Sequence, residues 1–192
     1  MNSKAIRLLG AFALATLISI QPVAAMSDVH SSKSYSGNGT YKVGKAIKPG
    51  IYVSKNSQSA FCYWATLSGF SGKLSDISAS DIGGGQAIVE IQSTDKGFKS
   101  NRCGKWSRLG TLKNLAVIPG NGTFSVGDQI APGTYQSTAK SDMCYWATLS
   151  GFTGTLDQIN ASDIAEGPQI VEITDGDVGF KTSRCGSWKR ID

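Results

Sequence analysis

The chain has 192 residues, a formal net charge of +5, four cysteines and one histidine. A charge this small does not indicate a nucleic acid or an anionic membrane as the binding partner. The single histidine, His30, lies near the N-terminus, ahead of the duplicated region. A Ser/His/Asp or Cys/His nucleophilic site would therefore have no base in that region.

The first 25 residues have the composition of a secretory signal peptide. Lys4 and Arg7 precede an uncharged apolar stretch, and small residues lead to a cleavage point after Ala25. The apolar stretch is too short to span a bilayer comfortably, and no later segment approaches the roughly 20 apolar residues of a transmembrane helix. We expect a secreted protein, outside the cell or in the cell envelope, whose mature chain has no transmembrane segment. Residues 26–36 are predicted to form a flexible leader.

Most of the remaining chain is a tandem duplication. The segment GNGTYKVGKAIKPGIYVS, which begins at Gly37, returns as GNGTFSVGDQIAPGTYQS at Gly120, and CYWATLSGF occurs at residues 62–70 and 144–152. The two copies share 41 identical pairs over about 73 aligned positions, and each has the size of a small independent domain. We assign residues 37–109 to β module 1 and residues 120–192 to β module 2. The connector, residues 110–119, is apolar and is expected to pack against one or both modules.

About six short β-strands are predicted in each copy, separated by glycine-rich turns. In the first copy they lie around Tyr41 and Tyr52, at residues 61–67 and 87–91, and around Phe98 and Trp106. The stretch LSDISASDI from Leu74, and its counterpart LDQINASDI from Leu156, lack a strand period. Their Ser and Asp residues suit helix caps and turns, so we expect an ordered loop with one helical turn.

The four cysteines indicate disulfides, because the protein is expected to be exported. Cys62 and Cys103 are separated by 41 residues, and so are Cys144 and Cys185, as expected if a disulfide within one module was duplicated with it. A zinc site is the alternative, but it would need the two copies to pool their cysteines. The predicted fold class is all-β: two tandem homologous small β-sandwich or barrel-like modules, each with one disulfide.

The repeated CYWATLSGF motif is predicted to be a strand with two different faces. With period two, Trp64 lies on the same face as Cys62, and Tyr63 lies on the opposite face. A core tryptophan packed on the disulfide is the ordinary interpretation. The opposite face is also fairly apolar, so it is either central in a small core or covered from outside, for instance by the other copy. An aromatic binding surface built on Tyr63 and Tyr145 is the functional interpretation.

Carboxylates are the remaining candidates for catalysis. Asp81 aligns with Asp163, but Asp76 is replaced by Gln158, so a carboxylate pair is not kept in both copies. We expect Asp81 and Asp163 to cap a turn or to pair with Arg102 and Arg184. We expect no metal site and no cofactor.

Charge is divided unequally between the modules. Residues 37–109 contain ten Lys or Arg against four Asp or Glu, whereas residues 120–192 contain five against nine. Drift on two solvated surfaces is one explanation. The other is attraction between the halves, within a molecule or between neighbouring molecules, so self-association through oppositely charged halves is a hypothesis.

The linked motifs GTYxVGxxIxPGxYxS, CYWATLSGFxG, VEI and GFK…CGxW resemble a module of secreted proteins and lipoproteins of actinobacteria, over nearly the whole of each copy. The resemblance implies an extracytoplasmic β module without an established activity. This chain differs from the lipoprotein members because it lacks the lipid-accepting cysteine.

These features together predict a non-catalytic protein that binds an extracellular protein, a glycan or a cell-wall component. The candidate binding residues are Tyr63, Tyr145, Trp64, Trp146, Asp81 and Asp163. A secreted inhibitor or toxin-like factor, which would present residues 71–85 to its target, is an alternative. A hydrolase that uses loop carboxylates is the alternative from another class.

Overall fold

The computed structural model describes residues 33–56, 61–140 and 143–192. These residues belong to one compact unit that runs from Ser32 to Asp192. The expected signal peptide and most of the expected leader lie outside the described residues. No helix in the described part of the chain is long and apolar enough to cross a membrane.

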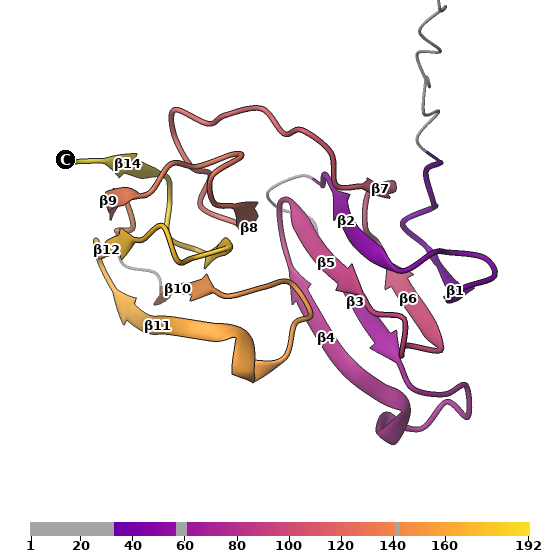
Figure 1. Ribbon diagram of the computed structural model, residues 1–192. Helices are drawn as coiled ribbons and strands as arrows, with labels where there is room; N and C mark the ends of the chain where they lie inside the picture. The colour runs from indigo at the N-terminus through magenta and orange to yellow at the C-terminus, as the bar shows by residue number, and fades with distance from the viewer. Residues whose placement is uncertain (1–32, 57–60, 141–142) are drawn as a thin grey trace, which may run out of the picture. The chain divides into compact units, whose positions relative to one another are not determined.

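Each module contains seven strands among the described residues, in the same order (Figure 1). Module 1 consists of β1 (Gly39–Lys42), β2 (Gly50–Ser54), β3 (Cys62–Leu67), the 3-10 turn η1 (Leu74–Asp76), β4 (Ile77–Gly83), β5 (Ala87–Ile91), β6 (Gly97–Asn101) and β7 (Trp106–Arg108). Module 2 consists of β8 (Gly122–Ser125), β9 (Gly133–Ser137), β10 (Met143–Leu149), η2 (Leu156–Gln158), β11 (Ile159–Glu166), β12 (Ile170–Ile173), β13 (Gly179–Ser183) and β14 (Trp188–Arg190).

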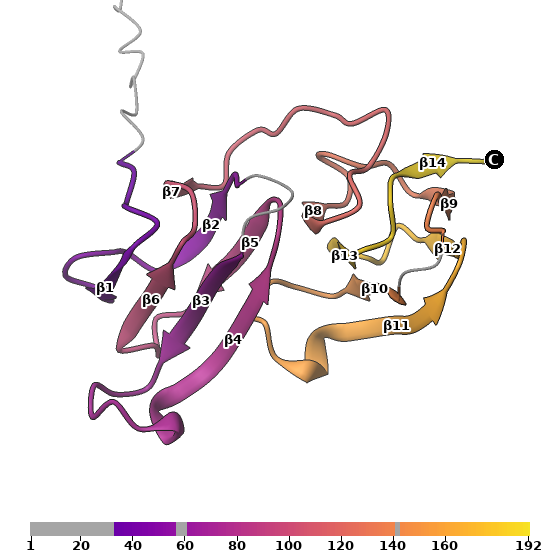
Figure 2. The same ribbon diagram turned by 180° about the vertical axis from the view of Figure 1, so that it is seen from behind.

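The strands of each module form two open antiparallel sheets, which Figure 2 shows from behind. The four-stranded sheets have the orders β1-β6-β3-β4 and β8-β13-β10-β11, and the three-stranded sheets have the orders β5-β2-β7 and β12-β9-β14. The all-β prediction is confirmed, and because the sheets do not close, each module is a small sandwich and not a closed barrel.

A buried tryptophan at the start of the last strand organises each core. In module 1, Trp106 is fully buried and its ring meets the Phe98 ring edge to face, with the centroids 5.2 Å apart. The indole nitrogen donates to Ser100 Oγ at 2.8 Å, and this hydroxyl in turn donates to the carbonyl of Gly37 at 2.8 Å. Module 2 repeats the arrangement with Trp188. These buried polar atoms are thus paired, which keeps their burial from costing stability.

Both disulfides form within a module, as predicted: Cys62 with Cys103, and Cys144 with Cys185. The alternation predicted for β3 also holds, because Cys62 and Trp64 belong to the same buried cluster. Each disulfide closes a loop of about 40 residues, which on the chain-entropy model restricts the unfolded chain by about 4 kcal/mol.

The prediction for the stretch after Leu74 is right for the helical turn and wrong for the remainder. The turn is η1, but the following residues form β4, an edge strand paired along its length with β3. β4, with the sequence ISASDIG, is rich in small and polar residues and contains little that marks a strand locally. It forms because β3 offers backbone groups that need partners, and its exposed Ser78 and Ser80 side chains suit a sheet edge.

Each module begins earlier than the repeat boundaries suggest. Tyr35, within the segment predicted as leader, pairs with Trp106 in a β-bridge and packs on the core of module 1. Ile118, at the end of the apolar connector, makes the equivalent bridge to Trp188 and is fully buried. The connector therefore packs against module 2, as its composition indicates.

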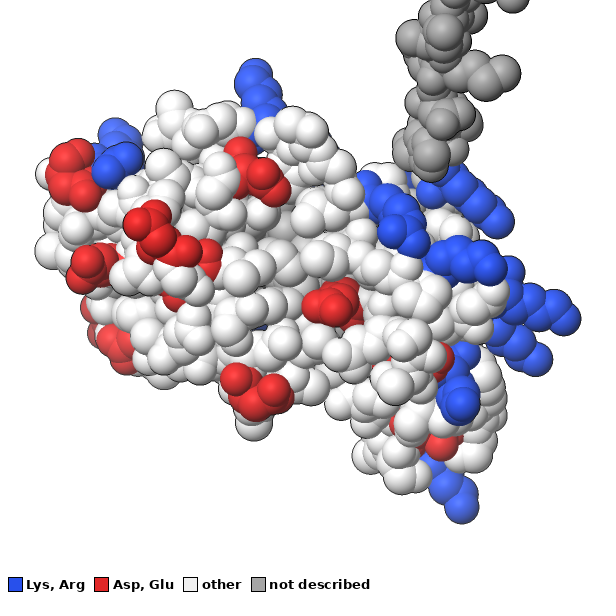
Figure 3. Space-filling model, in the orientation of Figure 1, with Lys and Arg blue, Asp and Glu red and all other residues white. Residues whose placement is uncertain are grey.

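The unequal division of charge persists on the surface. Figure 3 shows Lys and Arg gathered mainly over module 1 and Asp and Glu mainly over module 2. The two modules of one chain therefore present surfaces of opposite sign to a neighbour.

Candidate functional site: a groove present in both modules

A groove lies on the outer face of the four-stranded sheet of module 2. Its floor contains Tyr145, Leu149 and Lys181, and its wall is the loop at residues 151–158. The three floor residues share a face because alternate residues of the paired strands β10 and β13 point the same way.

Module 1 fills most of this groove. Phe152, from the wall, is only 4% exposed and lies in an apolar cluster with Val53 and Ile88 of module 1. The indole of Trp64 lies against Gly154, where an added Cβ would collide with the ring. A cavity of about 180 Å³ remains between the modules. One aromatic side chain of each module, Phe152 or Trp64, thus packs against the other module.

Backbone and amide hydrogen bonds fix the register of the two modules. The amide of Glu90 donates to the carbonyl of Phe152 at 2.7 Å, and the amide of Thr123 donates to the carbonyl of Gln86 at 2.8 Å. The side chains of Gln86 and Gln129 exchange two further bonds, of 2.7 and 3.2 Å. These contacts place β5 of module 1 beside β8 of module 2 (Figure 1).

Among the described residues, one ion pair crosses the interface. Lys181 Nζ donates to Asp81 Oδ1 at 2.6 Å, and it also lies 6.0 Å from the centroid of the Tyr145 ring. Asp81 reaches this position because it pairs with Trp64 on the neighbouring strand, so both side chains point toward module 2. The two charged side chains are 29% and 23% exposed, so the pair contributes no more than about 1 kcal/mol and serves mainly to select the partner.

Module 1 has the same groove, and there it is open. Its floor contains Tyr63, Leu67 and Lys99, the counterparts of the floor residues of module 2, and its volume is about 500 Å³. Phe70, the counterpart of Phe152, is 52% exposed, while Leu74 at the tip of this wall and its counterpart Leu156 on the other wall are both 85% exposed. Large apolar side chains exposed together in this way are a common mark of an interaction surface.

The wall of the open groove is held in place without a partner. Asp76 Oδ2 accepts hydrogen bonds from the amide of Ser71 at 2.5 Å, from its hydroxyl at 2.8 Å and from the amide of Gly72 at 3.1 Å. In module 2, Gln158 Oε1 does the same for the amide of Thr153 at 2.9 Å. A wall that is already ordered costs less conformational entropy when a partner binds.

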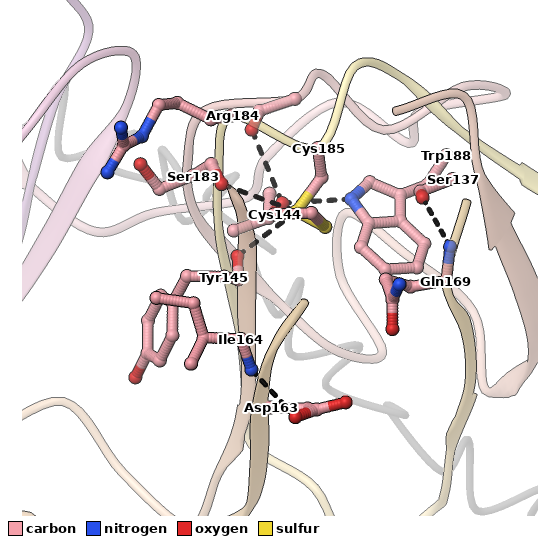
Figure 4. The surroundings of a disulfide bond; sticks show 12 residues. Ser137, Cys144, Tyr145, Asp163, Ile164, Gln169, Ser183, Arg184, Cys185 and Trp188 are labelled. Atoms are coloured by element: carbon pink, nitrogen blue, oxygen red, sulfur yellow. Dashed lines mark hydrogen bonds between the residues drawn. A yellow bond between two sulfur atoms is a disulfide. The ribbon is translucent and has the colours of Figure 1, made fainter. Parts of the chain in front are cut away.

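Module 2 has an uncovered face equivalent to the part of module 1 that lies in the interface. We call it the free face; it carries Trp146, Asp163 and Ile170. Asp163 is exposed and accepts a hydrogen bond from the amide of Ile164 at 2.8 Å. Figure 4 shows Ile164 beside Tyr145, with Asp163 on the other side of the strand. Trp146 is partly buried, and Ile170, the counterpart of Ile88, is 59% exposed. Within the described parts of the chain, this face therefore lacks the cover that module 2 gives to module 1.

In each module one buried carboxylate, Asp95 or Asp177, holds the turn before the sixth strand. The environments of these two carboxylates differ. Burial raises the pKa of Asp95, which accepts the amide of Gln92 at 2.7 Å. Burial opposes ionisation of Asp177 too, but hydrogen bonds from Asn160 at 2.8 Å and from Thr174 at 2.8 and 3.0 Å outweigh it and lower the pKa of Asp177. The described residues contain no group of three or more His, Cys, Asp or Glu side chains suited to a metal ion.

Comparison with known families agrees with this duplicated architecture. The model of the Rv1352-like extracellular domain matches residues 33–107 and again residues 116–189. The chain belongs to this family. Its two Rv1352-like modules each begin just before Tyr35 or Ile118, the residues that bridge to the core tryptophans. The family places the protein outside the cytoplasm, as expected, and the disulfides agree with that location.

Curated relatives of the Rv1352-like modules come from mycobacteria. The uncharacterized protein Rv1352 of Mycobacterium tuberculosis strain H37Rv is 33% identical over 87 residues, which cover 38% of this chain and 71% of that protein. The uncharacterized protein Mb1387 of Mycobacterium bovis matches with the same identity and coverage. The resemblance to an actinobacterial secreted module is therefore supported at the level of the family, and no solved structure matches the chain significantly.

The six candidate binding residues fall on different surfaces of the two Rv1352-like modules. Trp64, Asp81 and Tyr145 meet in the interface, and Tyr63 lies on the floor of the open groove. Trp146 and Asp163 lie on the free face of module 2. Of the two roles expected for Asp81, a turn cap or a pair with Arg102, the pair with Arg102 is not formed; the ionic partner of Asp81 is Lys181, which was not among the candidates.

A pattern in the sequence could have identified Lys99 and Lys181 as groove residues. Lys99 and Lys181 stand at the same position of the repeated GFK motif, and each lies between a core aromatic residue and a buried hydroxyl residue. A strand that alternates in this way turns its lysine outward, onto the same face as the motif tyrosine.

Proposed function

We propose that this protein is a non-catalytic binding protein of the extracytoplasmic space and that the open groove of module 1 is its binding site. The observation that supports this proposal is the duplication of the groove. In module 2 the groove already holds protein side chains and its wall phenylalanine, Phe152, is buried, whereas in module 1 the equivalent Phe70 is exposed to solvent.

The filled groove indicates what chemistry fits the open one. Its occupant supplies an indole against the glycine of the wall, an aliphatic side chain against the wall phenylalanine, and a carboxylate to the floor lysine. The open groove offers the same three elements: Gly72, Phe70 and Lys99. A protein segment that carries an apolar wedge beside an acidic residue is the ligand that these groups recognise.

The positions of the carboxylates favour binding over hydrolysis. Asp81 is engaged with Lys181 in the interface, whereas Asp163 is exposed on the free face of module 2. A glycosidase or a related hydrolase needs two carboxylates at a set separation across one cleft. All four cysteines are in disulfides, so no thiolate nucleophile is present.

Retention on natural surfaces tests the proposal. The mature protein and its variants Phe70→Asp and Lys99→Glu are passed at low concentration over immobilised cell-wall, glycan and secreted-protein fractions of a mycobacterium. Lys105→Glu is the matched control, because Lys105 is exposed on module 1 outside the lining of the groove. We expect the wild type and the control to be retained and both groove variants to lose about tenfold in retention. Equal retention of all four proteins, or of none, would count against the proposal.

A further inference from the structure

Each module has a copy of one interface surface that the described residues of its own chain leave uncovered. These surfaces are the open groove of module 1 and the free face of module 2. Building on the proposed binding role of the groove, we propose that its occupant is module 2 of a second copy of this chain, docked as module 1 docks on module 2 within one chain. Repetition of one contact between unlike surfaces links copies head to tail.

Burial of equivalent residues outlines the two unused surfaces. Ile88 is 3% exposed and its counterpart Ile170 is 59% exposed, while Phe152 is 4% and its counterpart Phe70 is 52% exposed. Each exposed member therefore belongs to a surface whose partner is missing. Seating Phe70 of one copy beside Ile170 of the next would bury both, as the internal interface does.

Charge favours a second copy as the occupant. The internal Lys181–Asp81 pair corresponds to Lys99 on the open groove and Asp163 on the free face, which already have opposite charges. The two surfaces also carry charges that the internal interface lacks. Lys73, on the wall of the open groove, replaces Thr155, and Lys42 on β1 replaces Ser125. On the free face of module 2, Glu166 replaces Gly84. Added positive charge on one surface and added negative charge on the other strengthen their mutual attraction and oppose like-with-like contacts.

Backbone groups are available for the same bonds. In the internal interface the amide of Glu90 donates to the carbonyl of Phe152. The counterparts are the amide of Glu172 on the edge strand β12 and the carbonyl of Phe70 on the wall of the open groove. Docking of a second copy would join this donor to this acceptor.

Two substitutions make the contact between copies weaker than the internal one. Gln86 corresponds to Pro168, and Gln129 corresponds to Ala46, so the paired amides of the internal interface have no equivalent. The contact between copies also lacks the advantage of a covalent connector, which raises the effective concentration of the internal partner. Association between copies is therefore reversible and depends on concentration and salt.

Sedimentation equilibrium of the mature protein tests the proposal. The weight-average mass is measured from about 10 µM to about 1 mM protein, at about 20 mM and about 500 mM salt. We expect the mass to rise with protein concentration at low salt and to fall back toward that of the monomer at high salt. A monomer at all concentrations in low salt would overturn the proposal. The proposed binding function would survive that result if the groove variants still lost retention on envelope fractions.

Charge exchange identifies the surfaces. Lys99→Glu and Asp163→Lys each place like charges in the contact, so each variant alone is expected to remain monomeric. In an equimolar mixture, the glutamate introduced in one variant can meet the lysine introduced in the other, and the native Lys99 and Asp163 can meet as well. The mixture should therefore associate as the wild type does.

Two control variants carry the same charge changes elsewhere. Lys105→Glu and Asp175→Lys alter exposed positions outside the two surfaces and should associate normally. Association of the separate Lys99→Glu and Asp163→Lys variants, or none in the mixture of correctly folded variants, would overturn the assignment of the surfaces.

Discussion

The two wall phenylalanines provide a matched test of the interface. Phe152 is almost fully buried against Val53 and Ile88 of module 1, whereas Phe70 is 52% exposed and rests on Gly97 of its own module. Truncation of a buried phenylalanine to alanine removes about 130 Å² of buried apolar area, which at about 25 cal/mol per Å² costs about 3 kcal/mol. Phe70 buries about half as much area and leaves no closed cavity, so Phe70→Ala is expected to cost about 1.5 kcal/mol.

Urea unfolding at low protein concentration, followed by far-UV circular dichroism and tryptophan fluorescence, measures both costs. Phe152→Ala should lower the free energy of unfolding by about 1.5 kcal/mol more than Phe70→Ala. It should also expose Trp64 to solvent while each module keeps its native circular dichroism. Equal costs for the two substitutions would refute the docking of module 1 in the groove of module 2.

Three further experiments test other parts of the structure. Gly154→Ala and Gly72→Ala impose the same backbone strain, with φ of +81° and +80°, but only the first meets the Trp64 ring, so thermal unfolding should show an additional loss of about 1–3 kcal/mol for it alone. Asp177→Asn should destabilise the protein at pH 7 by about 1–3 kcal/mol, whereas Asp95→Asn should be neutral or stabilising. This follows because the lowered pKa of Asp177 favours folding above its ordinary value of 3.8, an effect that is lost as the pH falls through the folded pKa. Burial of Asp95 instead penalises its ionised form and raises its pKa, so the stability that protonated Asp95 contributes is lost as the pH rises through the folded pKa. The free energies of unfolding of the two variants, measured by denaturant titration, should converge at low pH. Reduction of the disulfides should cost about 2–5 kcal/mol per module, and mass spectrometry before reduction should find no free thiol.

The fold was predictable where the sequence repeats a local pattern. The duplication, the disulfide pairing and the burial of Trp64 with Cys62 follow from spacing and from the period of a strand. β4 was not predictable from its own residues, because its strand conformation depends on pairing with β3. Local propensity gives little information about an edge strand whose exposed face is polar.

The location of the filled groove was also beyond local reasoning. CYWATLSGF is identical in the two copies, yet Phe152 is buried and Phe70 is half exposed. The difference arises from docking, because module 1 covers the groove of module 2 and nothing in the described residues covers the groove of module 1 in the same way. The residues that distinguish the copies, such as Gln86 and Gln129, flank the motif and have no recognisable pattern alone.

Amide hydrogen exchange of the monomer, measured residue by residue by NMR, tests the central claim most directly. The claim is that one of two equivalent grooves is filled and the other is open. The amide of Glu90 donates to Phe152 and the amide of Thr123 donates to Gln86, so both should exchange slowly. Their counterparts, the amides of Glu172 and Thr40, lie on edge strands with no such acceptor among the described residues and should exchange rapidly. Equally rapid exchange of Glu90 and Glu172 would show that the modules do not dock, and would contradict the account.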